Sequence, residues 1–182
     1  SLFNFPLAMH NGLIINSVRK LGTSTAKNFG KELLNIYEQY GTGNPEFIDA
    51  PFLSNHDTTR ISAGCINNED QMKMSAGVLL TLNGSPYVYY GEEIGMNSMG
   101  SKEWSAVDAT GITSPPPGAD EVEQKFKPLD EQMKDPRSIY HYYKRAIRIR
   151  NENPEIARGE MSIIEELCTK DISAIKKIYE GS

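Results

Sequence analysis

Short apolar runs alternate with longer amphipathic stretches along most of the chain. Three short runs, residues 2–7, 47–53 and 87–90, are mainly apolar and aromatic. Parallel strands that are buried on both faces have this pattern, so each run predicts a strand. Pro51 falls inside the second run and predicts a bend or bulge there, because proline has no N–H to donate to a neighbouring strand.

The stretches between and after these runs predict helices over residues 24–40, 69–82 and 137–151. The first and third repeat their apolar residues every three or four positions, and the second is rich in Met, Ala, Val and Leu. Ser24 is the expected N-cap of the first helix. Asp135-Pro136 places an N-cap residue before a proline at the first helical position and predicts the start of the third helix. That helix is expected to end before Asn153-Pro154.

Two further segments have a different composition. Residues 91–136 are rich in Gly, Pro, Ser and Asp, and predict a long loop of the kind that usually has a function. Residues 161–167 and 172–179 predict a pair of strands. Alternating strands and helices favour parallel strands in α/β units. Since an eight-stranded α/β barrel needs about 250 residues, three such strands form either a small open sheet or part of a barrel.

Composition narrows the class of protein. The 182 residues carry a net charge of −5 and are 38% hydrophobic, which predicts a folded chain and argues against nucleic acid or an anionic membrane as partner. No apolar run approaches the roughly 20 residues of a membrane span. Cys65 and Cys168 stand far apart without histidines at zinc spacing, so two separate thiols are favoured over a metal site. A disulfide between these two cysteines is the alternative. Both a secreted or cell-surface location and a cytoplasmic location are therefore compatible with the sequence.

A polar Asn55-His56-Asp57 follows the second predicted strand directly. Ligand and catalytic sites of α/β folds lie at the carboxyl ends of their strands. In such a site the imidazole can donate to sugar hydroxyls and the carboxylate can accept from them. The alternative is structural: Asp57 caps a helical turn that begins at Thr58-Thr59, and His56 is an ordinary loop residue.

Two adjacent carboxylates, Glu92 and Glu93, follow the third predicted strand. Neighbouring glutamates in a loop are usually a solvated pair, and this is the expectation from the residues alone.

Together, the two stretches resemble the α-amylase superfamily of glycoside hydrolases. Residues 52–57 are similar to the family's seventh-strand motif Phe-x-x-Asn-His-Asp. Residues 84–93 are similar to its eighth-strand motif Gly-x-Pro-x-x-Tyr-x-Gly-Glu-Glu. Two motifs in the right order imply the C-terminal part of a (β/α)8 barrel, strands six to eight with their helices, over residues 1–158. Residues 159–182 would then begin a truncated C-terminal β-sandwich domain, seen here as a short β segment.

The resemblance implies a retaining α-glucan hydrolase with three carboxylates. The nucleophile and the acid/base, held ~5–5.5 Å apart in retaining enzymes, lie before the sixth strand in the family and are therefore expected outside this chain. Asp57 would be the third carboxylate, which favours the distorted, oxocarbenium-like sugar. His56 and Asn55 would bind the same sugar. The chain alone is accordingly expected to be inactive, with an α-glucan or malto-oligosaccharide as the parent protein's substrate.

The resemblance leaves some residues open. Arg60 either reaches substrate or pairs with a neighbouring carboxylate, and Trp104 either stacks on a sugar or packs under the long loop. After the eighth strand the family often carries Arg-x-Pro-Met-x-Trp, of which residues 99–104 keep only the tryptophan. No cofactor or metal is expected in this chain; the family's calcium-holding insert would belong to the missing part of the parent.

There are three alternative hypotheses. In the first, the parent protein is a transglycosylase of the same superfamily. In the second, the parent is an inactive amylase-like barrel that binds a partner, and in the third, the chain is a self-sufficient small α/β domain. The intact Asn55-His56-Asp57 favours an enzyme. The last alternative would leave sheet edges uncovered, and such edges drive association. The chain by itself is therefore expected to self-associate.

Overall fold

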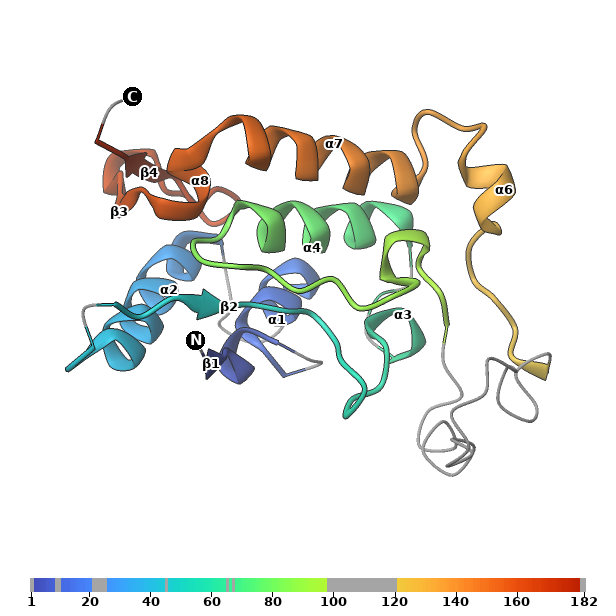
Figure 1. Cartoon of the computed structure of the whole chain (residues 1–182), viewed down its shortest axis with the longest axis horizontal. Helices are drawn as coiled ribbons and strands as arrows, with labels where there is room; N and C mark the ends of the chain where they lie inside the picture. Colours follow the sequence, from blue (N-terminus) through green and yellow to red (C-terminus); the bar gives the residue numbers. More distant parts are fainter. Residues whose placement is uncertain are drawn as a thin grey trace.

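The computed structural model describes residues 2–8, 11–20, 26–44, 46–64, 66, 68–97 and 121–180 (Figure 1). The helices are α1 (Leu13–Arg19), α2 (Ala26–Gly41), α3 (Ile61–Gly64), α4 (Glu69–Thr81), α6 (Leu129–Gln132), α7 (Ile139–Glu152) and α8 (Pro154–Arg158). The strands are β1 (Leu2–Phe3), β2 (Asp49–Ala50), β3 (Glu160–Ile163) and β4 (Ile175–Ile178). Short 3₁₀ turns are η1 (Phe5–Leu7), η2 (Glu92–Ile94) and η4 (Glu165–Leu167).

The three predicted strand segments lie side by side, parallel and in chain order. β1 pairs with β2 in the register Leu2 to Asp49, and a parallel bridge joins Phe52 to Tyr87. The expected parallel α/β arrangement is therefore confirmed. The expected lengths are wrong, since regular pairing covers two residues in β1, two in β2 and a single bridge at Tyr87.

Prolines account for two of the shortened strands. Pro6 lies within η1, where its fixed φ suits a helical turn and ends β1. Pro51 lies between β2 and the bridge at Phe52, at the predicted bend, and its carbonyl still accepts a hydrogen bond of 2.8 Å from the backbone N–H of Tyr87. The third segment is thus held beside the second by isolated bonds rather than by a continuous ladder.

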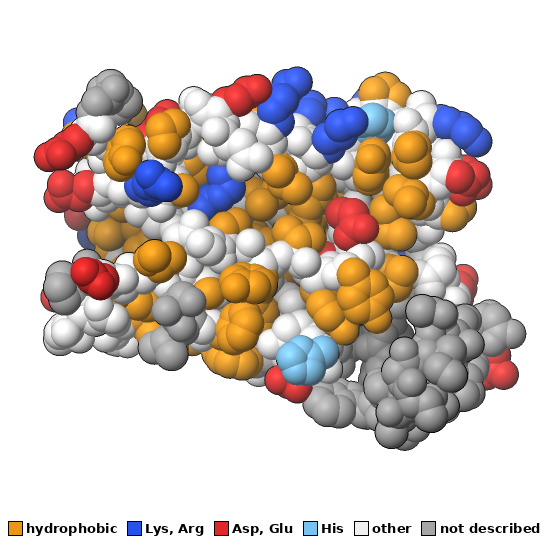
Figure 2. Space-filling view, in the orientation of Figure 1, with side chains coloured by type: hydrophobic (Ala, Val, Ile, Leu, Met, Phe, Trp, Pro, Cys, Tyr) orange, Lys and Arg blue, Asp and Glu red, His pale blue; other side chains and the backbone are white. Residues whose placement is uncertain are grey.

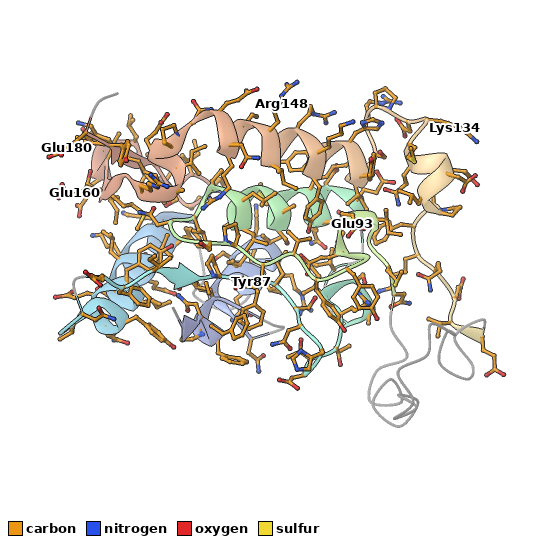
Figure 3. All side chains as sticks on the ribbon, viewed as in Figure 1. Tyr87, Glu93, Lys134, Arg148, Glu160 and Glu180 are labelled. Atoms are coloured by element: carbon orange, nitrogen blue, oxygen red, sulfur yellow. The ribbon has the colours of Figure 1, made fainter. Side chains whose placement is uncertain are left out.

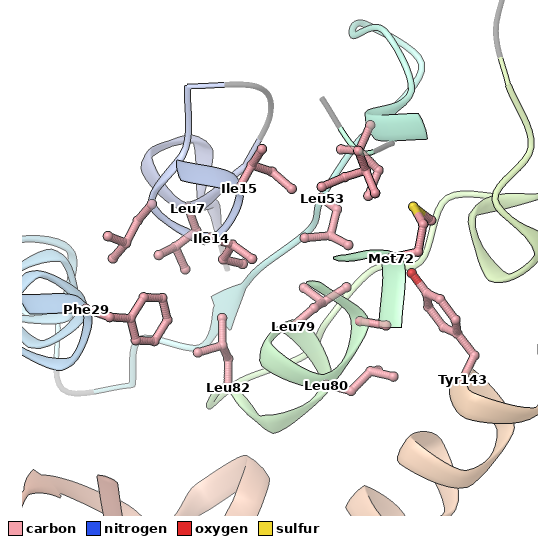
Figure 4. Packing of buried hydrophobic residues seen from close by; sticks show 14 of the residues in the cluster. Leu7, Ile14, Ile15, Phe29, Leu53, Met72, Leu79, Leu80, Leu82 and Tyr143 are labelled. Atoms are coloured by element: carbon pink, nitrogen blue, oxygen red, sulfur yellow. The ribbon is translucent and has the colours of Figure 1, made fainter. Parts of the chain in front are cut away.

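Helices α1, α2, α4 and α7 share one hydrophobic core with the strand segments. Figure 4 shows Leu7, Ile14 and Leu53 facing Leu79 within this core. All four side chains are fully buried. α7 runs alongside α4 (Figure 1), and Tyr142 of α7 lies against Gly77 of α4, where a side chain would collide with its hydroxyl group. The small residue therefore permits close packing of the two helices.

The predicted second and third helices exist; the second starts at the predicted residue, Glu69, and the third starts later than expected. α4 begins after Asn68, whose side chain accepts a hydrogen bond of 2.9 Å from the N–H of Gln71. α7 begins after Ser138, which accepts from the N–H of His141, so the expectation of a start at Asp135-Pro136 is wrong. The Asp135 carboxylate instead accepts from the backbone of Arg137 and closes a turn before the helix.

The first predicted helix is confirmed as α2, although its expected cap, Ser24, lies outside the described residues. Among the described residues, four helices were not predicted: α6, which lies in the expected loop, and three others. α1 is a seven-residue helix after Gly12, α3 a single turn, and α8 a short helix that starts at Pro154. Pro154 ends α7 as expected, but the fixed φ of this proline also suits the first turn of a new helix, α8.

The C-terminal strand pair is confirmed as the antiparallel hairpin β3–β4, while residues 165–167 form η4 instead of extending the first strand. Lys177 of β4 attaches the hairpin to the helices, because its ammonium donates to the carbonyls of Thr81 at 2.7 Å and Ile156 at 2.6 Å. The described part of the loop over 91–136 is not structureless, since it contains η2 and α6. Cys168 is a free thiol; Cys65 lies outside the described residues.

A group of aromatic side chains gathers on the strand segments outside the helix-side core. The Phe3 ring contacts the rings of Phe52 and Tyr87, and Phe5 contacts Phe52. Phe52 is buried, but Phe3 and Tyr87 are 50% and 52% exposed, so the expectation of strands buried on both faces is wrong for this face. Hydrophobic side chains lie over the middle of the surface in Figure 2. Among the described helices, none is long and apolar enough to cross a membrane.

Candidate active site

The Asn55-His56-Asp57 turn begins where the second strand segment ends. The side chain of Asn55 accepts a hydrogen bond of 2.9 Å from the N–H of Asp57, and the Thr58 hydroxyl accepts one of 3.0 Å from the N–H of Asn55. These bonds fold the backbone into a tight turn. The next helix, α3, starts only at Ile61, so the alternative in which Asp57 caps a helical turn at Thr58 is wrong.

This turn presents its two ionisable side chains to solvent. Nε2 of His56 lies 3.4 Å from Oδ1 of Asp57, and the side chains are 76% and 51% exposed. An exposed carboxylate beside an imidazole can accept from one hydroxyl of a polyol while the ring donates to another. The pair is therefore accessible to a ligand and chemically suited to a sugar.

A buried carboxylate lies behind the turn. Glu92, at the start of η2, is 3% exposed; it accepts hydrogen bonds of 2.8 Å from the Ser54 hydroxyl and 3.2 Å from the Tyr143 hydroxyl. Burial raises the pKa of Glu92 to about 7, against the lowering effect of these two hydrogen bonds and of Arg60. The expected solvated pair is thus wrong for Glu92. Figure 3 labels its neighbour Glu93, which is only partly buried.

Arg60 is buried between the turn and the loop that carries Glu92. Its guanidinium lies 4.6 Å from the ring centre of Tyr89 and 4.5 Å from that of Tyr90, and donates to the backbone carbonyl of Tyr90. Arg60 is only 2% exposed and lies near the carboxylate of Glu92. These observations favour pairing of Arg60 with a neighbouring carboxylate over direct contact with substrate. Its role in substrate binding stays a prediction.

Gln132 of α6 fastens the loop that carries Glu92 to the helices. Its side-chain amide donates to the carbonyls of Ile94 at 2.8 Å and Lys127 at 2.6 Å, and its side-chain oxygen accepts from the N–H of Tyr140 at 3.1 Å. Gln132 itself is 3% exposed. The loop after the third strand segment is therefore fixed from both sides, by Ser54 and by Gln132.

The structure brings together Asn55, His56 and Asp57 on one turn and places Arg60 behind it. Trp104 lies outside the described residues. Ser54 and Tyr143 were not predicted as part of this region. Ser54 immediately precedes the motif, which is a usable signal, whereas Tyr143 stands on the apolar face of its helix and only the fold shows where its hydroxyl points. Among the described residues, no group of His, Cys, Asp and Glu is placed to hold a metal ion.

The sequence profile of the α-amylase catalytic domain matches residues 4–125, which include the turn, Arg60 and Glu92. The chain belongs to the α-amylase family. Its curated relatives in the family include "Alpha-amylase 3" of Dictyoglomus thermophilum, 33% identical over 193 aligned positions. They also include "Alpha-amylase SusG" of Bacteroides thetaiotaomicron, 32% identical over 173 positions. These alignments cover 96% and 87% of this α-amylase family chain.

Solved structures of α-amylase family members agree. Eubacterium rectale Amy13B superposes on 98% of the chain with a TM-score of 0.85 and 34% identity. The α-amylase from H. orenii superposes on 98% with a TM-score of 0.74 and 30% identity. This family chain spans only 35% and 24% of the two curated relatives and 37% and 36% of the two solved chains. It therefore corresponds to part of an α-amylase catalytic domain.

Proposed function

We propose that this chain is the part of a retaining, α-glucan-active glycoside hydrolase that supplies the third carboxylate, Asp57, and the sugar-binding His56. The observation that carries the proposal is the turn at the end of the second parallel segment, where both side chains are exposed and 3.4 Å apart. Its family membership and the names of its relatives, "Alpha-amylase 3" and "Alpha-amylase SusG", support an α-glucan as substrate.

In this proposal the three parallel segments are strands six to eight of a (β/α)8 barrel, residues 1–158 belong to the barrel, and residues 159–182 open a C-terminal β domain. Asp57 accepts hydrogen bonds from two hydroxyls of the sugar at the cleaved bond. Asn55 fixes the turn, and His56 donates to the same sugar. Hydrogen bonds that strengthen as the sugar flattens towards an oxocarbenium ion contribute several kcal/mol to the transition state.

The nucleophile and the acid/base are not assigned to any residue of this chain. Glu92 does not replace them, because its carboxylate is buried and already accepts from Ser54 and Tyr143. The isolated chain is thus proposed to be inactive, and the hydrolase activity to belong to the longer parent. Its exposed aromatic face is proposed to drive self-association of the isolated chain.

A transglycosylase parent is the second candidate. Relatives named "4-alpha-glucanotransferase" of Thermotoga maritima, 28% identical, and "Cyclomaltodextrin glucanotransferase" of Bacillus sp., 37% identical over 83 positions, support this possibility. Both candidates use the same sugar contacts at Asp57 and differ in whether water or a second sugar accepts the glycosyl group.

A grafting experiment tests the proposal. This chain replaces the superposed segment of Amy13B, where it covers 98% of its own length, and the graft and the isolated chain are incubated with maltotriose. We expect the graft to release glucose and maltose and the isolated chain to release neither. Longer oligosaccharides as the main products would favour the transglycosylase. A folded graft without turnover, or turnover by the isolated chain, would contradict the proposal.

A further inference from the structure

A cavity lies on the helix side of the chain, separate from the Asn55-His56-Asp57 turn. It has a volume of about 620 Å³, inside the range of roughly 300–1,000 Å³ that is usual for small-molecule sites. α1, α2, α4, α8 and the β3–β4 hairpin contribute its walls. None of its described lining residues belongs to the turn or to η2.

The walls of this cavity are mostly apolar. Their hydrophobic part comes from the helices and from both strands of the hairpin, and includes Val18, Phe29, Leu33, Val78, Met161 and Ile175. Several of these residues also pack against the central core, so the walls are fixed in place. An occupant must therefore have an apolar body.

The charged groups of the lining are mainly positive. Three lysines, Lys20, Lys170 and Lys177, face two carboxylates, Glu155 and Asp171. Asp171 already accepts from Lys20 at 3.3 Å and from Lys170 at 2.8 Å. A local excess of positive charge on a chain of net charge −5 favours an anionic occupant.

Lys177 is the group best placed to bind that anion. Its ammonium has three N–H donors, and carbonyls of α4 and α8 accept from two of them, at 2.7 and 2.6 Å. Burial and the nearby Arg150 lower the pKa of Lys177 to about 8. An anion at the third donor would offset both unfavourable effects on the charged form.

We propose that this cavity binds an amphipathic molecule with one carboxylate, such as a medium-chain carboxylic acid. The alkyl part lies among Phe29, Leu33 and Met161, and the carboxylate accepts from Nζ of Lys177. Binding is strongest where Lys177 is protonated, and weakens as the pH rises above about 8. Glu155 and Asp171 oppose the carboxylate, whereas Arg150, and Lys20 and Lys170 beside Asp171, favour it. The site is independent of the proposed hydrolase activity.

The test is a titration of the full chain with sodium octanoate at pH 7, with 1-octanol as the uncharged ligand of equal length. Methionine methyl groups labelled with ¹³C report the location by NMR, because Met74 and Met161 line the cavity and Met96 and Met133 do not. We expect saturable shifts of Met74 and Met161 only, and at least tenfold tighter binding of octanoate than of octanol.

Variants separate charge from folding. Lys177→Gln should remove the preference for octanoate, while Lys177→Arg, which keeps the charge, should retain most of it. Arg158→Gln removes an exposed positive charge outside the cavity and should change nothing. Equal binding of octanoate and octanol, shifts that spread to Met96 and Met133, or an unchanged preference in a folded Lys177→Gln variant would overturn the proposal.

Discussion

The hydroxyl group of Ser54 donates a hydrogen bond of 2.8 Å to Oε2 of Glu92. Ser54 is the residue before the Asn55-His56-Asp57 turn, and Glu92 begins η2, so this buried contact joins the ends of the second and third strand segments. The position of the exposed carboxylate of Asp57 therefore depends on a residue 35 positions further along the chain. Arg60 and Tyr143 complete the support of that contact.

The protonation of Glu92 should control stability. Its pKa of about 7 in the folded chain lies above the ordinary value of 4.5, so between these values the folded state holds more protons than the unfolded state. The contribution of Glu92 is fully present below pH 4.5, and the free energy of unfolding falls as pH rises through 7, by roughly 3 kcal/mol at about 1.4 kcal/mol per pKa unit. Glu92→Gln should remove this loss.

Urea unfolding at pH 5 and pH 8 measures the effect. Glu92→Gln is expected to match the wild-type chain near pH 5 and to be more stable at pH 8. The control, Glu131→Gln, changes an exposed glutamate of α6 and should follow the wild-type chain at both pH values. Parallel pH dependence of the wild-type chain and Glu92→Gln would show that the carboxyl is already ionised when folded.

Gly84 should tolerate no side chain. Its φ is +85°, and a Cβ there would lie 2.2 Å from the backbone carbonyl oxygen of Asp49. Strain in the left-handed region costs of order 1–3 kcal/mol, and the collision adds to it. Gly84→Ala is therefore expected to lower the free energy of unfolding by at least about 2 kcal/mol.

The matched control is Gly41→Ala at the end of α2, where a Cβ meets no other atom within 4 Å. Thermal and urea unfolding of both variants should show a large loss at position 84 and a change below about 1 kcal/mol at position 41. Similar stabilities of the two variants would contradict the close approach of Gly84 to β2.

The exposed aromatic face should make the isolated chain associate. Phe3 and Tyr87 are each about half exposed, and so are Phe5 and Ile48. Light scattering coupled to size exclusion at micromolar concentration is expected to give a mass above the 20.3 kDa of one chain. Tyr87→Ser should shift the mass towards the monomer, and Leu167→Ser, an exposed residue of η4, should not. A stable wild-type monomer would overturn this expectation.

The sequence pattern predicted the type and order of the helices and strands better than the residues at which they begin and end. Amphipathic periodicity predicted α2 and α7, a composition rich in Met, Ala, Val and Leu predicted α4, and the apolar runs predicted parallel segments in chain order. The short length of the strands could not be predicted from the apolar runs. Phe3 and Tyr87 are apolar residues, but their type does not show whether a neighbouring element covers them. Asp135-Pro136 predicts an earlier start of α7 than the observed cap, Ser138. Both residues can cap a helix, and packing of Ile139 into the core favours the later one.

The exposed part of the candidate site followed from sequence and its support did not. Asn55-His56-Asp57 is a continuous motif at the end of a predicted strand, so it can be recognised from the sequence alone. Glu92 joins Ser54 and Tyr143 across 38 and 51 positions, and only the fold shows that this glutamate is buried. From its residue type alone, a glutamate is expected to be exposed to solvent.

The most direct test of the central claim is the kcat of the Asp57→Asn variant in the Amy13B graft with maltotriose. Asp57 is proposed to act on the distorted sugar, so Asp57→Asn should lower kcat by about 100-fold or more with little change in KM. His56→Ala should cost less, and Asp130→Asn, an exposed aspartate of α6, nothing. A raised KM with unchanged kcat for Asp57→Asn would contradict the account, because it would mean that Asp57 binds the relaxed substrate and the transition state equally well.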